Sequence, residues 1–453
     1  MTEERRAVRR QQVYACLEAK NYPELRSLLR EMNPADIGSL FEDIEPNMQP
    51  VVFRLLPKAT AAVAFSYMEA EEQENLLRSF TDKELEDVMR EMYIDDAVDF
   101  IEEMPASVVW RILRHTDTEM RAALNQLLQY PKDSAGSIMT PEFVDLRKNM
   151  TVREAFGRIR ATGLDKETVY TCYVIDDTRH LEGIVTVKDL LLSPMEATMD
   201  QIMQTNVIYA KTLQDQEEVA GLLEKYDFLA VPVVDGEQRL VGIVTIDDAI
   251  DVIQEEATED IEKMAAIVPS DKPYIRQSVF ELYKSRIPWL LLLMVSATFT
   301  GTIISSFEAT LATFGALTMF IPMLMDTGGN CGGQASVSVI RGLSLGEVEY
   351  RDFFRVVWKE IRVAVLCGAT LAVANFVKIL LVDRVPVPVA AVVCLTLVCT
   401  VFVAKVVGCM LPIGAKRMGF DPAVMASPFI TTIVDAISLL IYMGMANLLL
   451  TAV

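Results

Sequence analysis

The sequence predicts a multidomain membrane protein, in which an all-α superhelical stack of short helices, an α/β tandem repeat and a long connecting helix precede a five-helix transmembrane bundle. The distribution of charge is the first observation behind this prediction. Residues 1–284 carry 54 acidic and 31 basic side chains, whereas residues 285–453 carry 9 and 11. The second observation is that five apolar runs, each long enough to cross a bilayer as a helix, all fall in the second part. The chain therefore divides into an acidic soluble part and a membrane part.

Residues 1–132 are expected to form an acidic helical N domain. Apolar side chains recur there at helical spacing, and units that end in proline resemble one another. The segments 36–46 and 96–105 are one such pair. Short stacked helices bury their apolar faces against their neighbours, so we expect a superhelical stack.

An internal repeat follows within residues 180–250. The segments 181–191 and 240–250 share the element Gly-Ile-Val-Thr-x-x-Asp, and each follows a run with strand-like composition. We therefore expect two α/β modules, over residues 133–200 and 201–255.

The chain from Asp247 to about Lys284 is predicted to form one long helix, whose last part, residues 256–284, connects to the membrane domain. Its acidic residues recur every three or four positions and share one face, where like charges repel each other. Either water solvates this face or cations neutralise it. Carboxylates clustered without imidazole or thiolate favour hard divalent cations such as hydrated Mg²⁺. The same pattern of clustered acids occurs at Asp95-Asp96-Asp99 and around Asp215 and Glu217.

The membrane domain, residues 285–453, is expected to contain five spans. They cover residues 287–307, 314–340, 361–382, 388–411 and 424–450. With the N-terminus in the cytoplasm, the loops on the inner side hold nearly all of the flanking basic residues, and the outer loops hold only Arg384. Met1 opens directly into a polar helical pattern rather than a signal peptide. We therefore expect a multi-pass protein of the cell membrane, with the N-terminus inside and Val453 outside.

Asp435 lies in the middle of the last apolar run. A carboxylate near the bilayer centre costs roughly 2.5–3.5 kcal/mol, so such residues pair with another group or line a water-filled path. Ser427 and Thr431 precede it at intervals of four and extend a polar stripe along the same helix face. An ion pair with Lys405 or Lys378 is the alternative explanation.

A second polar stripe occurs in the second predicted span. Asp326, Asn330 and Gln334 follow one another at intervals of four, with glycines between them. Two polar stripes in a small bundle indicate an aqueous pathway that these residues line. The alternative is that the glycines serve only close helix packing.

Composition argues against several classes of enzyme. The seven cysteines include no CxxC pair, and the chain has two histidines, so neither a histidine zinc site nor a Ser-His-Asp triad is expected. We expect that the protein is not an enzyme and, with a net charge of −21, that it has no nucleic-acid partner.

The repeated element resembles a tandem pair of CBS domains. In that family the Thr and Asp of the element often contact the ribose and phosphate of an adenine nucleotide. The resemblance therefore implies ATP as a ligand of Thr186, Asp189, Thr245 and Asp248. The alternative is that these side chains cap the helix that follows each strand.

Over essentially its whole length the chain resembles the MgtE-type magnesium transporter family. The motifs that carry this resemblance are Gly328-Gly329-Asn330 through Gln334, Arg341-Gly342, Asp421-Pro422-Ala423, Pro428-Phe429 with Thr431-Thr432 and Asp435, and Glu256-Ala257-Thr258-Glu259-Asp260-Ile261.

The resemblance implies a homodimer in the lipid bilayer, whose pore contains both copies of Asp435. There the carboxylates would bind Mg²⁺ through its water shell, and Thr431 and Ser427 would add oxygen ligands. The family also implies that the acidic part senses cytosolic Mg²⁺. The matching positions are Asp95 or Asp96, Asp215, Glu217, Asp248, Asp251, Glu256, Glu259 and Asp260.

We therefore expect a Mg²⁺-selective, Mg²⁺-gated channel or transporter that imports divalent cations and closes when cytosolic Mg²⁺ binds its acidic domains. Two alternatives stay open. Asp326 and Asp435 could form an intramembrane aspartyl protease, although the Gly-x-Gly-Asp signature is absent. The spans could also merely anchor a CBS sensor that transports nothing. The sequence leaves the preference among Mg²⁺, Mn²⁺ and Co²⁺ open.

Overall fold

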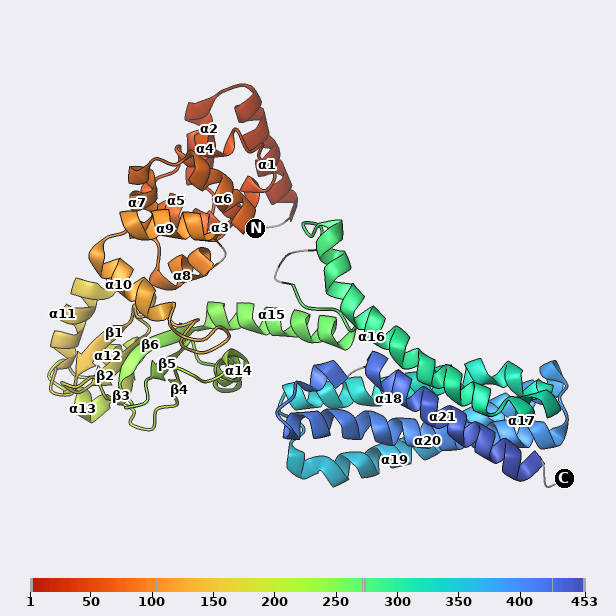
Figure 1. Ribbon diagram of the computed structural model, residues 1–453. Coiled ribbons are helices and arrows are strands. Elements are labelled where there is room, and N and C mark those ends of the chain that lie inside the picture. The colour runs from red at the N-terminus through yellow and green to blue at the C-terminus, as the bar shows by residue number, and fades with distance from the viewer. Residues whose placement is uncertain (1–2, 103, 271, 273, 426, 451–453) are drawn as a thin grey trace. The chain divides into compact units, whose positions relative to one another are not determined.

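The computed structural model describes residues 3–450 except 103, 271, 273 and 426, and the side chains of residues 3–7, 165 and 427 are outside the description. The chain forms two compact units, residues 1–253 and 254–453. Each unit is described by itself (Figure 1).

The first unit begins with a stack of short helices. They are α1 (Glu3–Glu18), α2 (Tyr22–Arg30), α3 (Pro34–Phe41), α4 (Gln49–Phe53), α5 (Lys58–Ser66), α6 (Ala70–Ser79), α7 (Asp82–Glu91), α8 (Ile94–Glu102), α9 (Ala106–His115) and α10 (Thr118–Leu127). Local sequence sets their starts: Thr81, for example, forms a capping box with Glu84 at the start of α7. Inside the stack, Phe65 meets the rings of Phe53 and Phe100 edge to face, with centroids 6.0 and 5.1 Å apart. The predicted all-α stack is confirmed.

Two three-stranded sheets of the same topology follow. The first contains β1 (Val144–Arg147), β2 (Thr171–Ile175) and β3 (Leu181–Thr186), and the second contains β4 (Ala210–Lys211), β5 (Ala230–Val234) and β6 (Leu240–Thr245). In each sheet the first two strands are parallel and the last two antiparallel. The associated helices are α11 (Val152–Thr162), α12 (Val187–Leu192), α13 (Met199–Ile202) and α14 (Gln216–Tyr226). The equivalent topology confirms the predicted tandem of α/β modules.

The connecting helix is shorter than predicted. α15 runs from Ile246 to Met264, and the next helix begins only at Val279, so the prediction of one helix from Asp247 to about Lys284 was wrong beyond Met264. Ala266 has a left-handed backbone (φ 56°), and Pro269 follows three residues later, where it disfavours the helical conformation of the residue before it. Ser278 then starts the new helix by a capping box with Glu281.

Five long helices form the membrane domain. The last four run side by side, and the first lies along them only over its C-terminal part (Figure 1). They are α16 (Val279–Ser306), α18 (Ile321–Ser344), α19 (Phe353–Lys378), α20 (Val387–Arg417) and α21 (Ser427–Leu450), with the short α17 (Glu308–Thr313) after α16. The segments 279–306, 350–383, 387–417 and 422–450 meet the length and hydropathy of a membrane span. α18 is less apolar because it carries glycines and the predicted polar stripe. It starts later than the predicted residue 314, because a 3₁₀ turn over Gly315–Phe320 precedes Pro322.

Glycines allow α18 to approach α20 and α21 closely. A Cβ atom on Gly329 would lie 2.8 Å from Cγ2 of Thr431, and one on Gly332 would lie 2.8 Å from Cγ2 of Ile430. A Cβ atom on Gly408 of α20 would collide with the backbone carbonyl oxygen of Gly332. Backbone-to-backbone approach of this kind is how membrane helices associate, since lipid supplies no hydrophobic drive between them.

We predict that Gly408→Ala destabilises the bundle by roughly 1–3 kcal/mol, because a methyl group must fit against a backbone carbonyl that cannot move aside. Gly414→Ala is the matched control in the same helix, since a Cβ atom there meets nothing within 4 Å. Thermal unfolding of the purified protein in detergent measures both. An unchanged midpoint for Gly408→Ala would contradict the close packing of α18 and α20.

Candidate functional site

One face of α18 presents the predicted polar stripe. Asp326, Asn330 and Gln334 are all exposed, whereas the glycines between them, such as Gly329 and Gly332, are buried against α20 and α21. The glycines therefore serve close packing on one side of the helix, and the polar residues lie together on the other side, where the predicted aqueous pathway stays a prediction.

Asp435 of α21 is partly exposed, and Asp326 is the charged group that acts on it electrostatically. One turn earlier, the hydroxyls of Thr431 and Thr432 donate hydrogen bonds to the carbonyl oxygen of Pro428, at 2.9 and 3.1 Å. Each hydroxyl oxygen keeps lone pairs for a further contact. Ser427 begins α21, but its side chain lies outside the described residues.

The lysines considered as partners of Asp435 are engaged elsewhere. Lys405 pairs with Glu360, with Nζ 3.7 Å from Oε2, and Lys378 pairs with Asp383 at 2.8 Å. Among the described residues no lysine or arginine forms an ion pair with Asp435. The structural ion-pair explanation is thus wrong. The face that holds Asp326 and Asp435 offers only oxygen ligands, which suit hard cations.

A second group of carboxylates lies in the first unit. Oxygens of Asp95, Glu142 and Glu167 all lie within 4.8 Å of one another, a spacing at which one metal ion could bridge them. Asp95 is 9% exposed, and one carboxylate oxygen of Glu167 is buried without a hydrogen-bond partner. Carboxylates this close, one buried and two partly exposed, repel each other when charged unless a cation compensates them.

These three residues, together with the neighbouring Asp96, Asp247 and Asp248, are called the acidic cluster below. The raised pKa values among them reflect the cost of burying carboxylates close together. Burial, together with Asp247 and Asp248, raises the pKa of Glu167 to about 8. Burial raises the pKa of Asp248 to about 7, against the hydrogen bond that Asp248 accepts from Thr245, and it raises the pKa of Asp95 well above the usual range. The pKa of Asp96 is also raised by burial and by Asp247.

The members of the acidic cluster come from two helices and two loop segments. Asp95 and Asp96 lie in the first turn of α8, where the Ile94 amide donates to Oε2 of Glu142 at 3.2 Å. Glu142 precedes β1, and the backbone amide of Glu167 donates to its carbonyl oxygen at 3.0 Å. Asp247 and Asp248 occupy the first turn of α15. Two helix N-termini therefore point at the cluster, where their partial positive charge favours carboxylates.

The predicted regulatory residues fall into three groups. Asp95, Asp96 and Asp248 meet in the cluster, and the pKa of nearby Asp251 is raised by burial and by Asp247. Asp215 instead caps α14, where it accepts a hydrogen bond from the Glu217 amide at 2.9 Å, and both side chains are exposed.

Glu256, Glu259 and Asp260 form the third group, in the last turns of α15 and in the second unit. Lys263 pairs there with Glu259 and, at 2.6 Å, with Asp421 in the segment between α20 and α21. Ser344 of α18 donates to Oδ2 of Asp260 at 3.0 Å, and burial raises the pKa of Asp260. The end of α15 therefore docks on one end of the membrane bundle.

Sequence reasoning missed Glu142 and Glu167 as members of the cluster. Each is a single acid in a loop, next to Pro141 and Lys166 respectively, and neither belongs to a spaced run of acids. Asp247 was recognised as part of the acidic helix but not as a site residue. A stretch of chain outside regular structure gives no periodic signal, so only the tertiary contacts identify these residues.

The Thr and Asp of the two repeated elements are used for helix capping. Thr186 forms a capping box with Asp189 at the start of α12, and the hydroxyl of Thr245 donates to Oδ2 of Asp248 at 2.6 Å. In the second module this contact also joins Thr245 to the acidic cluster. The capping interpretation is confirmed, and a hydroxyl oxygen that donates one hydrogen bond can still accept another.

The chain matches known protein families along most of its length. Residues 321–445 match the MgtE model, described as a divalent cation transporter, and residues 32–133 match the MgtE intracellular N domain. Residues 135–196 and 199–255 each match the CBS domain.

Relatives and solved structures agree with these matches. The magnesium transporter MgtE of Thermus thermophilus is 38% identical over 433 residues, 95% of this chain and 96% of that protein. MgtE of Bacillus subtilis is 34% identical over 432 residues, 93% and 95% of the two chains.

A crystal structure of the cytosolic domain of the Mg²⁺ channel MgtE in complex with ATP is 37% identical, with a TM-score of 0.52 over 54% of this chain and 99% of that one. A crystal structure of the soluble part of a magnesium transporter is 31% identical, with a TM-score of 0.53 over 56% and 99%. Neither the protease nor the transport-free sensor finds support in these matches. The chain belongs to the MgtE family and is a magnesium transporter with a cytosolic regulatory domain.

Proposed function

We propose that Mg²⁺ crosses the membrane between two copies of this chain, along the face that contains Asp326, Asn330, Gln334 and Asp435. The observation that carries this proposal is that Asp326 is exposed and Asp435 partly exposed on the single chain, with no basic partner among the described residues. Facing lipid, each would cost roughly 2.5–3.5 kcal/mol. A second copy related by a two-fold axis covers this face with its own polar stripe and encloses a water-filled path.

The chemistry of this face suits a hydrated ion. Mg²⁺ gives up its water reluctantly and is commonly held by one or two carboxylates through a partly retained water shell. Two copies of Asp435 supply two such carboxylates. The Thr431 hydroxyl and the start of α21 at Ser427 supply further oxygen ligands. A wide site of this kind selects divalent over monovalent cations by charge, because carboxylates a few ångströms apart attract the higher charge more strongly.

Regulation is proposed to occur at the acidic cluster, through Asp95, Asp96, Glu142, Glu167 and Asp248. Without a divalent cation these carboxylates repel each other or bind protons, and with Mg²⁺ they are bridged. Binding at ten times the Kd contributes about 1.4 kcal/mol per site. About four such sites per channel suffice to move a gate from 1:99 to 99:1. Asp215, Glu217, Asp251 and Glu256 are further proposed ligands.

The docked end of α15 is the proposed gate. The acidic cluster includes the first turn of α15, and the last turn of the same helix holds Lys263, which pairs with Asp421 at the end of the bundle. Mg²⁺ bound at the cluster favours the docked arrangement and so closes the path, and its release frees the helix. Glu259 and Asp260 lie next to this contact, so Mg²⁺ bound there would also alter it.

Two further points belong to this proposal. The N-terminus lies in the cytoplasm and the C-terminus outside, as the basic residues that flank the spans indicate. An adenine nucleotide binds between the CBS modules near Thr186, Asp189 and Thr245. Support for the nucleotide comes from the similar cytosolic domain of MgtE, whose crystal structure is a complex with ATP.

Asp435→Ala is expected to reduce Mg²⁺ uptake to background while the protein still folds, because removing a carboxylate from a low-dielectric region does not cost stability. Uptake into liposomes, followed with an enclosed Mg²⁺-sensitive dye, measures this. Glu308→Gln is the control, since it removes an exposed carboxylate of α17 outside the proposed path. Uptake by Asp435→Ala at the wild-type rate would refute the assignment.

Glu167→Gln is expected to reduce the Mg²⁺ dependence of protease protection in the first unit. The neutral side chain removes repulsion, so digestion in Na⁺ alone should slow. The factor by which Mg²⁺ slows digestion should fall by about tenfold, which is the contribution expected of one Mg²⁺ site. Digestion of the whole protein at matched ionic strength provides the comparison. Glu119→Gln, an exposed acid of α10, should behave as wild type. If both variants respond to Mg²⁺ alike, the cluster is not the sensor.

The raised pKa values predict how pH acts on the first unit. Glu167 (pKa about 8) and Asp248 (pKa about 7) hold protons in the folded state that the unfolded chain releases near pH 4. With Mg²⁺ chelated, this contribution to stability is complete below about pH 4 and is lost as pH rises through 7 to 8. Thermal unfolding of the whole protein between pH 6 and 8.5 should show a falling midpoint for this unit. Mg²⁺ should abolish the decrease. A midpoint that rises with pH under chelation would contradict the cluster.

A further inference from the structure

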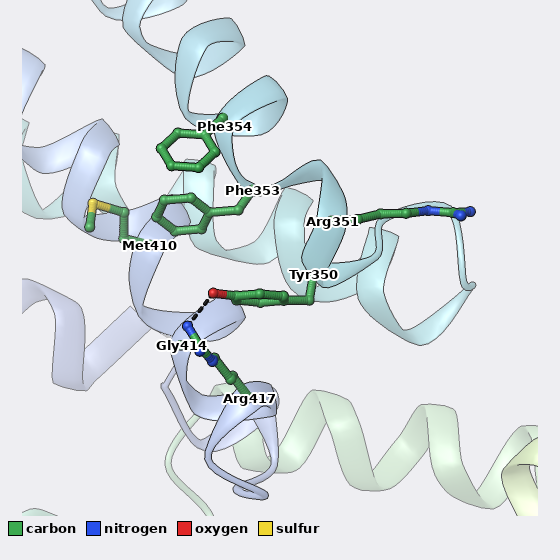
Figure 2. Close-up of a pocket in the computed structure, with 7 residues that line it drawn as sticks. All are labelled: Tyr350, Arg351, Phe353, Phe354, Met410, Gly414 and Arg417. Atoms are coloured by element: carbon green, nitrogen blue, oxygen red, sulfur yellow. Dashed lines mark hydrogen bonds between the residues drawn. The ribbon is translucent and has the colours of Figure 1, made fainter.

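A pocket of about 540 Å³ lies where α19 begins and α20 ends (Figure 2). The pocket is lined by Tyr350 and Arg351 of the 3₁₀ turn before α19, by Phe353 and Phe354 at the start of α19, and by Met410, Gly414 and Arg417 of α20. Its size is typical of sites for small molecules. The proposed ion path uses none of these residues.

The pocket lies at the end of the bundle on which α15 docks. Arg417 is four residues before Asp421, the partner of Lys263, and Lys416 donates a hydrogen bond to the carbonyl oxygen of Leu343 at the end of α18, at 3.0 Å. Helix ends such as these lie where a bilayer meets water, so the pocket is at the depth of lipid head groups.

Arg417 is the cation of this pocket that has no acidic partner. Its guanidinium lies over the ring of Tyr350, 4.6 Å from the centroid, and one of its nitrogens donates to the Tyr350 hydroxyl, as Figure 2 shows. No carboxylate pairs with it among the described residues. Arg351 differs, because it pairs with Glu349 at 2.8 Å and extends away from Arg417 in Figure 2. The stacked guanidinium is therefore held in place, with several N–H groups left to donate.

The other wall of the pocket is apolar. The rings of Phe353 and Phe354 and the thioether of Met410 lie on the same side of Tyr350 in Figure 2, and the Phe354 side chain is 82% exposed. Trp358, one turn further along α19, is 61% exposed. Trp and Tyr side chains, such as Trp358 here and Tyr350 of the pocket, are enriched at the membrane interface. A ligand of the pocket therefore has an anionic end and an apolar body.

We propose that this pocket binds one anionic phospholipid of the leaflet on this side, with its phosphate at Arg417 and the Tyr350 hydroxyl. The glycerol and the start of an acyl chain lie along Phe354 and Met410 toward Trp358. Basic pockets between membrane helices bind acidic head groups in this way. A soluble phosphate would use the cation but leave the apolar wall exposed to water, so the surface favours a lipid.

The test is native mass spectrometry of the full-length protein in detergent, with equal amounts of dioleoyl phosphatidylglycerol and dioleoyl phosphatidylcholine. Wild-type protein should retain phosphatidylglycerol preferentially. Arg417→Met should reduce the ratio of retained phosphatidylglycerol to phosphatidylcholine by about fivefold, the change expected for loss of one basic group near an anionic membrane surface. Arg384→Met, an exposed basic residue in the loop between α19 and α20 at the far end of α19, is the matched control and should keep the wild-type ratio.

Phe354→Ala keeps the test valid if Arg417→Met fails to fold, because an 82% exposed side chain contributes little to the core. It should weaken retention by roughly fivefold, the change that loss of about 40 Å² of apolar contact gives. Glycerol 3-phosphate added at the same concentration as the lipid should not displace it. The proposal is overturned by equal retention of the two lipids in the wild type, by equal effects of Arg417→Met and Arg384→Met, or by displacement with glycerol 3-phosphate.

Discussion

The structure depends on carboxylates held where bulk water does not fully solvate them. In the first unit, Asp95, Glu142 and Glu167 bring their oxygens within 4.8 Å, and burial, together with Asp247 and Asp248, raises the pKa of Glu167 to about 8. In the second unit, Asp326 lies in α18 and Asp435 in α21, and these two helices pack against each other in the bundle. Carboxylates in such surroundings cost free energy when charged, and a bound cation or proton lowers that cost.

The glycines of α18 let this helix pack closely on one side while its polar residues stay exposed on the other. Because Gly329 and Gly332 carry no side chain, α18 lies close to α20 and α21 on that side, and its polar residues remain together on the opposite face. A bulkier residue at either glycine would separate the helices and shift Asp326 relative to Asp435. Positioning of the polar stripe is therefore a consequence of backbone packing in the bundle.

The helix α15 contributes residues to both units. Its first turn belongs to the acidic cluster, and its last turns contact the bundle through Lys263 and Asp260. Lys263 is shared between Glu259 and Asp421, so the docked end is held by a small network in which each carboxylate competes for one ammonium group. A cation that binds near these acids would alter the balance of the network, which makes the contact suited to regulation.

The sequence by itself determined the division into soluble and membrane parts, the repeat of two α/β modules and the polar stripes, because these depend on composition and on periods of two and 3.6 residues. It did not determine where the connecting helix ends, since Ala266 adopts its left-handed backbone without a residue type that announces it. Only the tertiary structure decided that Glu142 and Glu167 join Asp95, and that Lys405 pairs with Glu360 rather than Asp435. These contacts connect residues far apart in the chain, and no local pattern encodes them.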